Sequence, residues 1–261
     1  MLLVAGLVCV YMRWVCGCVW GGVCGTDHED LFRQESTFQY LFGVKEADCY
    51  ATIEAKTGFT TLFIPRLPEA YAIWMGEIKT PEQFKAEYEV DAVHFVDDLK
   101  ATVEAYGPDR IYVSKGQNTD SGSFSVPAHI EGLEGVVYDD SRLYYDVVEC
   151  RVIKNEEELK LMRFVNEVSS DAHLQMMRRA RPGMMEYQLE ALYVANAYYF
   201  GGCRLLAYTA IAGSGKNSAT LHYGHAGAPN NKLIEDGDMI LVDMGAELHC
   251  YASDITNCFP A

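Results

Sequence analysis

Two aspartates near the C-terminal end of the chain, Asp243 and Asp254, most strongly restrict how it can fold. Asp243 ends the apolar run 239–242, and Asp254 follows residues 251–253, so both lie in strand-like, apolar surroundings. An unpaired carboxylate is costly in such surroundings, and we expect a positive group to face the pair. Two antiparallel strands could bring both carboxylates to one point. Oxygen ligands favour a hard cation such as Mn, Mg or Ca, although Zn or Co can share such a site.

The segment from Asp30 to Glu149 predicts a compact α/β unit, because strand-like and helix-like stretches alternate along it. A hairpin is expected where Lys56-Thr57-Gly58 separates two β-branched runs. Thr80 followed by Pro81 and Gln83 predicts a capped helix start. Strands are expected over residues 49–53, 60–64, 110–113 and 135–138, and a further helix over residues 98–106.

The C-terminal part of the chain, from a predicted boundary at residue 150, changes from helices to strands. Asn155 and Glu158 have the spacing of a capping box and begin a long helix. A second helix is expected over residues 186–200. Strands are then expected over residues 206–212 and 239–243, followed by a return strand at 248–251.

Two motifs in this part invite interpretations that their surroundings do not support. Residues 213–218 resemble a phosphate-binding loop, but the pattern requires Gly at 210 and Ser or Thr at 217, where the chain has Ala210 and Asn217. A glycine-rich connection between strands is expected instead. His222 and His225 are spaced as zinc ligands on one helix face would be, but the neighbouring Gly and Pro residues argue against a helix there.

Charge and cysteine content exclude some classes of protein. With 21 Lys and Arg against 37 Asp and Glu, the net charge of −16 argues against a nucleic-acid-binding protein, which needs a basic face for phosphates. None of the nine cysteines forms a Cys-x-x-Cys pair, which argues against a zinc ribbon or a thioredoxin-like site. Cysteines scattered through apolar segments are typical of a reducing compartment, so a cytoplasmic protein is expected.

Residues 1–25 differ from the rest in composition and are expected to form a divergent hydrophobic leader. Between residues 2 and 25 the only charge is Arg13, but glycines interrupt the apolar run and no basic segment precedes it. Membrane insertion, secretory targeting and a non-native leader all stay open. The first domain is therefore expected to begin at Thr26.

The residues around the two aspartates resemble the prolidase family, the Xaa-Pro dipeptidases of the creatinase, aminopeptidase P and methionine aminopeptidase superfamily. Residues 221–230, Leu-His-Tyr-Gly-His-Ala-Gly-Ala-Pro-Asn, carry the resemblance together with Asp243-Met244-Gly245 and residues 252–256. Residues 31–36, 42–44, 65–68, 74–76 and 118–122 carry the same resemblance in the N-terminal part. The likeness covers about residues 30–261.

The resemblance implies an α/β N-terminal creatinase-type domain over residues 26–149 and the first half of an α+β pita-bread metallopeptidase domain over residues 150–261. It implies a centre of two metal ions, usually Mn with Co or Zn possible, in which Asp243 binds one metal and Asp254 bridges both. It places the catalytic histidine His222 at the substrate, with Tyr208 lining the same substrate-binding pocket. It also implies an Xaa-Pro dipeptide substrate and a homodimer in the complete protein.

The family completes its metal centre with one histidine and two glutamates that come later in the chain, whereas this sequence stops at Ala261. The sequence therefore predicts a C-terminally truncated prolidase-like protein that is inactive alone. Two other functions stay open on sequence grounds. One is an aminopeptidase P-type exopeptidase, and the other is a non-catalytic pita-bread protein that binds a partner.

Overall fold

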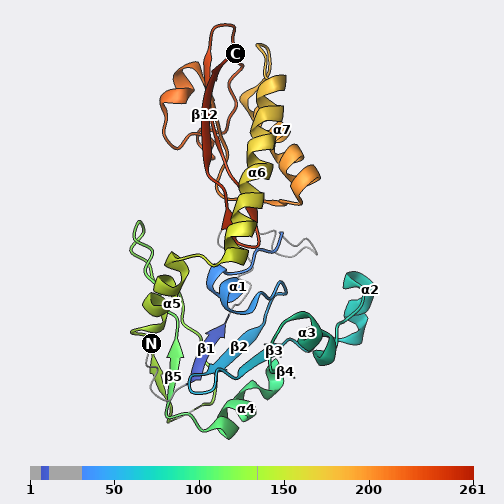
Figure 1. Ribbon diagram of the computed structural model, residues 1–261, viewed down its shortest axis with the longest axis vertical. Coiled ribbons are helices and arrows are strands. Elements are labelled where there is room, and N and C mark those ends of the chain that lie inside the picture. The colour runs from blue at the N-terminus through green and yellow to red at the C-terminus, as the bar shows by residue number, and fades with distance from the viewer. Residues whose placement is uncertain (1–6, 12–30, 134) are drawn as a thin grey trace. The chain divides into compact units, whose positions relative to one another are not determined.

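A computed structural model describes residues 7–11, 31–133 and 135–261 of the chain, which form two units (Figure 1). The units are Met1–Ile153 and Lys154–Ala261. The domain boundary expected between Glu149 and Cys150 falls inside helix α5 (Leu143–Val152), which the N-terminal unit keeps whole. None of the helices that the structure describes has both the length and the apolar character needed to cross a bilayer.

The N-terminal unit contains a mixed sheet of six strands in the order β4-β3-β2-β1-β5-β6. The predicted hairpin is confirmed, since β2 and β3 pair antiparallel with Tyr50 opposite Phe63. The consecutive residues Leu62 and Phe63 are fully buried in two different core clusters, so both faces of the sheet are covered. The strands are β1 (Leu7–Tyr11), β2 (Tyr50–Glu54), β3 (Thr60–Ile64), β4 (Ala92–Phe95), β5 (Arg110–Val113) and β6 (Val137–Asp139).

Two helices of the N-terminal unit, α3 and α4, have boundaries that the sequence predicts. The Thr80 side chain accepts a hydrogen bond from Gln83 N, and the Gln83 side chain accepts one from Thr80 N, which is the expected capping box. Gly107 ends α4 in the left-handed conformation, with φ of 59°. The helices are α1 (Ser36–Phe42), η1 (Glu69–Tyr71), α2 (Ala72–Met75), α3 (Pro81–Glu87), η2 (Val96–Asp98), α4 (Leu99–Tyr106) and α5.

Part of the expected leader belongs to this sheet. Residues 7–11 form β1, which pairs antiparallel with β2 and parallel with β5. The expectation that residues 1–25 stand wholly apart from the first domain is therefore wrong for these five positions, because β1 joins the two halves of the sheet. The other residues of the leader lie outside the described part of the chain.

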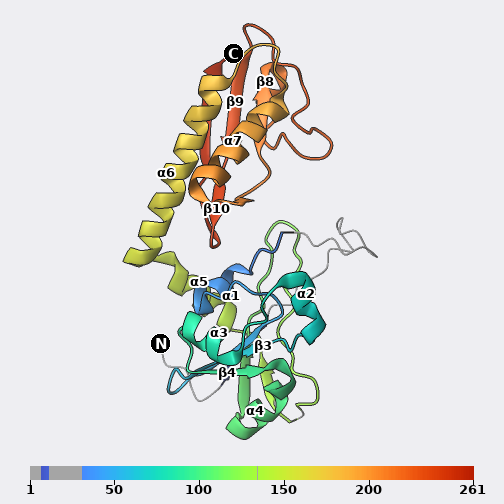
Figure 2. The same ribbon diagram turned by 90° about the vertical axis from the view of Figure 1, so that its right-hand side faces the viewer.

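The C-terminal unit packs two long helices, α6 (Glu156–Arg179) and α7 (Glu186–Gly201), against strands (Figure 2). Asn155 and Glu158 form the expected capping box at the start of α6, and three acidic residues in its first turn suit the helix dipole. The core between helices and strands is apolar and buried, and it includes Met176, Leu189, Tyr193, Ile240, Val242 and Met244.

The strands of this unit form two small sheets, in the orders β12-β9-β8 and β11-β10-β7. The alternating burial along β9 agrees with one face packed on the helices and one face more open. The strands are β7 (Leu205–Leu206), β8 (Ile211–Ser214), β9 (Met239–Met244), β10 (Ala246–Leu248), β11 (Tyr251–Ala252) and β12 (Ile255–Pro260).

Two of the strands expected in this unit are corrected by the structure. The strand expected over residues 206–212 is divided into β7 and β8, which pair in different sheets. The return strand expected over residues 248–251 is interrupted by a two-residue turn at His249 and Cys250, which have φ values of 50° and 65°, so its ends belong to β10 and β11. β9 pairs antiparallel with β12 over six residues, and with β8 on its other side.

Candidate metal and substrate site

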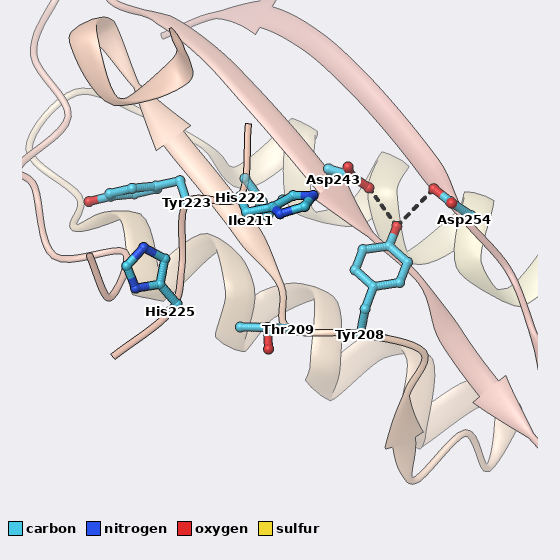
Figure 3. Close-up of a pocket in the computed structure, with 8 residues that line it drawn as sticks. All are labelled: Tyr208, Thr209, Ile211, His222, Tyr223, His225, Asp243 and Asp254. Atoms are coloured by element: carbon cyan, nitrogen blue, oxygen red, sulfur yellow. Dashed lines mark hydrogen bonds between the residues drawn. The ribbon is translucent and has the colours of Figure 1, made fainter. Parts of the chain in front are cut away.

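A pocket of about 440 Å³ in the C-terminal unit gathers the residues that the sequence singled out (Figure 3). It brings together both aspartates, the predicted substrate residues Tyr208 and His222, and His225. Its lining comes from the β7–β8 connection, from the first residue of β8, from the loop after η3 (Gly215–Ala219), from β9 and from the residue before β12. The lining residues are Tyr208, Thr209, Ile211, His222, Tyr223, His225, Asp243 and Asp254.

Sheet register places the two aspartates on the same face. Asp243 lies near the end of β9 and is paired directly with Thr256 of β12. Asp254 precedes Thr256 by two residues, so it lies on the same side of the strand and diagonally opposite Asp243. The convergence expected from the sequence is therefore produced by β9 and the approach to β12.

The Tyr208 hydroxyl lies between the two carboxylates. It donates to Asp243 Oδ1 at 2.5 Å and lies 3.1 Å from Asp254 Oδ1 (Figure 3). Burial raises the pKa of Tyr208, and the hydrogen bond to Asp243 raises it further. The phenol therefore keeps its proton at neutral pH, and the proton is directed at the acid pair. This contact with the acids is not foreseen in the sequence, where Tyr208 is expected only to line the substrate pocket.

Neither carboxylate has a cationic partner among the residues that the structure describes, where the ion pairs involve other acids. Asp243 is half-buried and Asp254 is exposed, so the expectation that both lie in apolar surroundings is wrong for Asp254. β12 begins only at the next residue, and the aspartate lies at the open rim of the pocket. Two close carboxylates without an ion-pair partner suit a bound cation, and their oxygens suit a hard one.

The described part of the chain holds no group of three or more His, Cys, Asp or Glu side chains arranged for a metal ion. The acid pair therefore provides two oxygen ligands, and the histidines of the pocket are not grouped with them as further ligands.

A close backbone approach holds Asp254 in its position. A Cβ atom on Gly245 would lie 1.9 Å from Ser253 O and 2.9 Å from Tyr208 Cε1, so only glycine fits there. The buried Ser253 pairs with Ala246, since Ala246 N donates to Ser253 Oγ at 2.9 Å and Ser253 N donates to Ala246 O at 2.9 Å. The residue before Asp254 is thereby fixed beside the strand that follows Asp243.

His222 and His225 lie in a loop without helical structure, as the sequence predicts. In the view of Figure 3 the His222 ring points toward the Asp243 side of the pocket. His225 Nδ1 accepts a hydrogen bond from Gly227 N at 3.1 Å, so this ring also supports its own loop. Gly224, with φ of 96°, brings the loop so near to β8 that a Cβ atom would lie 2.2 Å from Ala210 O.

His173 of α6 lies beneath the site and was not foreseen from the sequence. It is 2% exposed, and its Nε2 lies 3.0 Å from Met244 O, next to Asp243 in β9. A carbonyl can only accept, so Nε2 carries the proton. Within the described residues Nδ1 has no hydrogen-bond partner, which leaves the ring neutral. Burial lowers the pKa of His173, although the Met244 carbonyl and the charge of Asp243 oppose this.

We expect His173 to make the C-terminal unit less stable in acid. Because its pKa is lower in the folded state than the ordinary value of 6.5, the unfolded chain binds the proton more readily. Stability should therefore be full above pH 6.5 and fall as the pH decreases toward the folded-state pKa. His173→Gln keeps a donor for Met244 O but cannot titrate, so this part of the pH dependence should disappear. Thermal unfolding measured across this pH range compares the two proteins, and an equal dependence in both would contradict the assignment.

Family comparisons identify both parts of the chain. Residues 160–261 match Metallopeptidase family M24, and residues 23–112 match Aminopeptidase P, N-terminal domain. The chain is 48% identical over 236 residues to the "Xaa-Pro dipeptidase" of Homo sapiens, covering 90% of this chain and 48% of the relative. It is 33% identical over 240 residues to the "Probable Xaa-Pro aminopeptidase" of Paracoccidioides lutzii, covering 90% of this chain and 45% of the relative.

Solved structures agree with these matches. The aminopeptidase PepP of Pseudomonas aeruginosa is 28% identical with a TM-score of 0.77, and the match covers 97% of this chain and 57% of that one. The proline aminopeptidase P II of Yersinia pestis is 27% identical with a TM-score of 0.77, and the match covers 97% and 58%. The chain spans about half the length of the relatives it matches, 48% in the case of the human dipeptidase.

Proposed function

The chain belongs to metallopeptidase family M24 and carries an aminopeptidase P N-terminal domain, and from this premise we propose that the protein containing it hydrolyses Xaa-Pro dipeptides in a metal-dependent reaction. The observation that carries the proposal is the convergence of Asp243 and Asp254 on the Tyr208 hydroxyl, in a pocket that also contains His222. The higher identity to a dipeptidase than to an aminopeptidase favours the shorter substrate.

Asp243 and Asp254 are the proposed metal ligands, and Mn is the proposed metal. Their carboxylate oxygens are hard donors, and no lysine or arginine in the described residues competes for them by forming an ion pair. Bound metal supplies Lewis-acid activation of the scissile carbonyl and of water. The Tyr208 hydroxyl contacts one oxygen of each carboxylate and so holds the two side chains next to each other. The remaining carboxylate oxygens are then left for the metal.

His222 is the proposed substrate-contacting residue. It lines the pocket, and among the described residues it is not grouped with the two aspartates as a metal ligand. An imidazole at this place can donate to or accept from the polar groups of a dipeptide. Tyr208 is the other proposed substrate-binding residue. A homodimer and a cytoplasmic location are also proposed. Four cysteines of the described residues, Cys49, Cys150, Cys203 and Cys258, are free thiols, which supports a reducing compartment.

The test is hydrolysis of Gly-Pro by the protein containing this chain, with Mn²⁺ added after chelation. His222→Ala should raise KM for Gly-Pro about tenfold, the equivalent of one hydrogen bond to substrate. His94→Ala changes an exposed histidine of the N-terminal unit and serves as the matched control.

Two results would redirect the proposal. Faster cleavage of the tripeptide Gly-Pro-Gly than of Gly-Pro would assign an aminopeptidase P-type activity instead. If neither peptide were cleaved by the wild-type protein or by any variant, with or without Mn²⁺, a non-catalytic binding protein would be favoured.

A further inference from the structure

Glu186 is a buried acid outside the pocket that the proposed reaction does not use. It is the first residue of α7 and is 0% exposed. Within the described residues it forms no ion pair, so hydrogen bonds and the N-terminal end of the helix dipole must compensate its charge. A carboxylate buried at such cost indicates that its position matters to the segments bonded to it.

Both oxygens of Glu186 are saturated by donors from distant parts of the chain. Oε1 accepts from Ser214 N at 2.7 Å and from Ser214 Oγ at 2.8 Å. Oε2 accepts from the Tyr223 hydroxyl at 2.7 Å and from Lys232 N at 3.0 Å. Asn217 Nδ2 lies within reach of both oxygens, at 3.1 and 3.3 Å. One carboxylate thus connects the end of β8, η3, the loop that contains His222 and His225, and the segment at Lys232 that follows this loop.

Tyr223 connects this network to the pocket. Its ring is 5% exposed, and its hydroxyl donates to Glu186 while accepting from Asn217 Nδ2 at 2.8 Å. Burial and the bond to Glu186 raise the pKa of Tyr223 to about 12, so the hydroxyl keeps the proton that it donates. The residue before it is His222, which lines the pocket, whereas Glu186 is not in the pocket wall.

Asn230 fixes the other end of the same loop. Its Oδ1 accepts from Ala212 N at 3.1 Å, and its Nδ2 donates to Ala210 O at 3.0 Å. The loop is therefore attached at both ends, at Tyr223 to Glu186 and at Asn230 to β8 and the residue before it. Of the two attachments, the one beside His222 depends on the Glu186 carboxylate.

We propose that Glu186 is a positioning residue that sets the place of His222 through the hydroxyl of Tyr223. The proposal rests on the proposed function, in which His222 contacts the substrate. The network should act on substrate and not on metal, because Ser214 pairs with Ile240 of β9, whereas Ile211 at the opposite end of β8 pairs with Asp243.

The experiment uses two variants of the protein that contains this chain. Tyr223→Phe removes the connecting hydroxyl and keeps the ring. Glu186→Gln replaces one acceptor oxygen by an NH₂ group, which then faces donors on one side of the network. Tyr187→Phe, an exposed tyrosine of α7 at 51% exposure, is the matched control. The readouts are the ring resonances of His222 in NMR spectra, Mn²⁺ affinity, and KM and kcat for Gly-Pro.

In both variants we expect the His222 ring resonances to shift, KM to rise roughly tenfold with little change in kcat, and Mn²⁺ affinity to stay at the wild-type value. The control should match wild type in all three. Unmoved His222 resonances in both variants would overturn the proposal, and so would a loss of Mn²⁺ affinity parallel to a loss of thermal stability. Shifted resonances without a change in KM would uphold the positioning role and count against His222 as a substrate contact.

Discussion

Replacing Asp243 or Asp254 by Asn should lower Mn²⁺ affinity by at least about 100-fold, since changes to mere outer-shell partners of a metal already cost 10–100-fold. Each substitution keeps the shape of the side chain and removes one negative charge from a pair that has no ion-pair partner in the described residues. The Tyr208 hydroxyl should still find an acceptor, because an amide oxygen remains. The fold should therefore persist while the metal is lost. Electron paramagnetic resonance of free Mn²⁺ during a titration measures the change without any need for catalysis.

Asp236→Asn is the matched control for this experiment. Asp236 is an exposed acid in the turn before β9 and lines no part of the pocket. The Asp236→Asn substitution removes one negative charge from the same unit, so its Mn²⁺ affinity reports any general electrostatic effect of a less acidic surface. Equal Mn²⁺ affinity in Asp236→Asn, Asp243→Asn and Asp254→Asn would show that the ion binds elsewhere.

Gly245→Ala should destabilise the C-terminal unit by about 3 kcal/mol, at the upper end of the usual cost of overpacking. The added methyl group would meet the Ser253 carbonyl oxygen at 1.9 Å, and backbone on both sides cannot yield as a flexible side chain would. Tyr208 lies 2.9 Å from the same point, so the hydroxyl between the carboxylates should also move. We therefore expect faster amide hydrogen exchange in β9 and β10, together with weaker Mn²⁺ binding.

Gly237→Ala separates this steric effect from the general cost of replacing a glycine. Gly237 has φ of 87° but no atom within 4 Å of the added Cβ, so only backbone strain of about 1–2 kcal/mol is expected. Its exchange pattern in β10 and its Mn²⁺ affinity should resemble wild type. If the two alanine variants were equally stable and bound metal equally, the close approach at Gly245 would not be what positions Asp254.

Local interactions explain why much of the fold could be predicted. The capping boxes at Thr80 and Asn155 involve residues three apart, and the β2–β3 hairpin closes over a short turn. These preferences operate within a few residues, so the sequence displays them directly. The end of α7 before Gly202, which has φ of 65°, follows the same rule. The division of residues 206–212 between two sheets was not predicted, because that pairing depends on more distant partners.

By itself, the sequence predicted the residues that we propose carry the chemistry: Asp243 after an apolar run, a second acid at 254, and His222 in a glycine-bounded loop. Tertiary structure alone decided how they meet. The sequence did not indicate that β9 pairs with β12, that the Tyr208 hydroxyl lies between the acids, or that Glu186 is buried and bonded to Tyr223 and Lys232. These contacts join residues that are between 11 and 46 positions apart in the chain. Such contacts follow from strand register and from the closure of long loops, which no local pattern specifies.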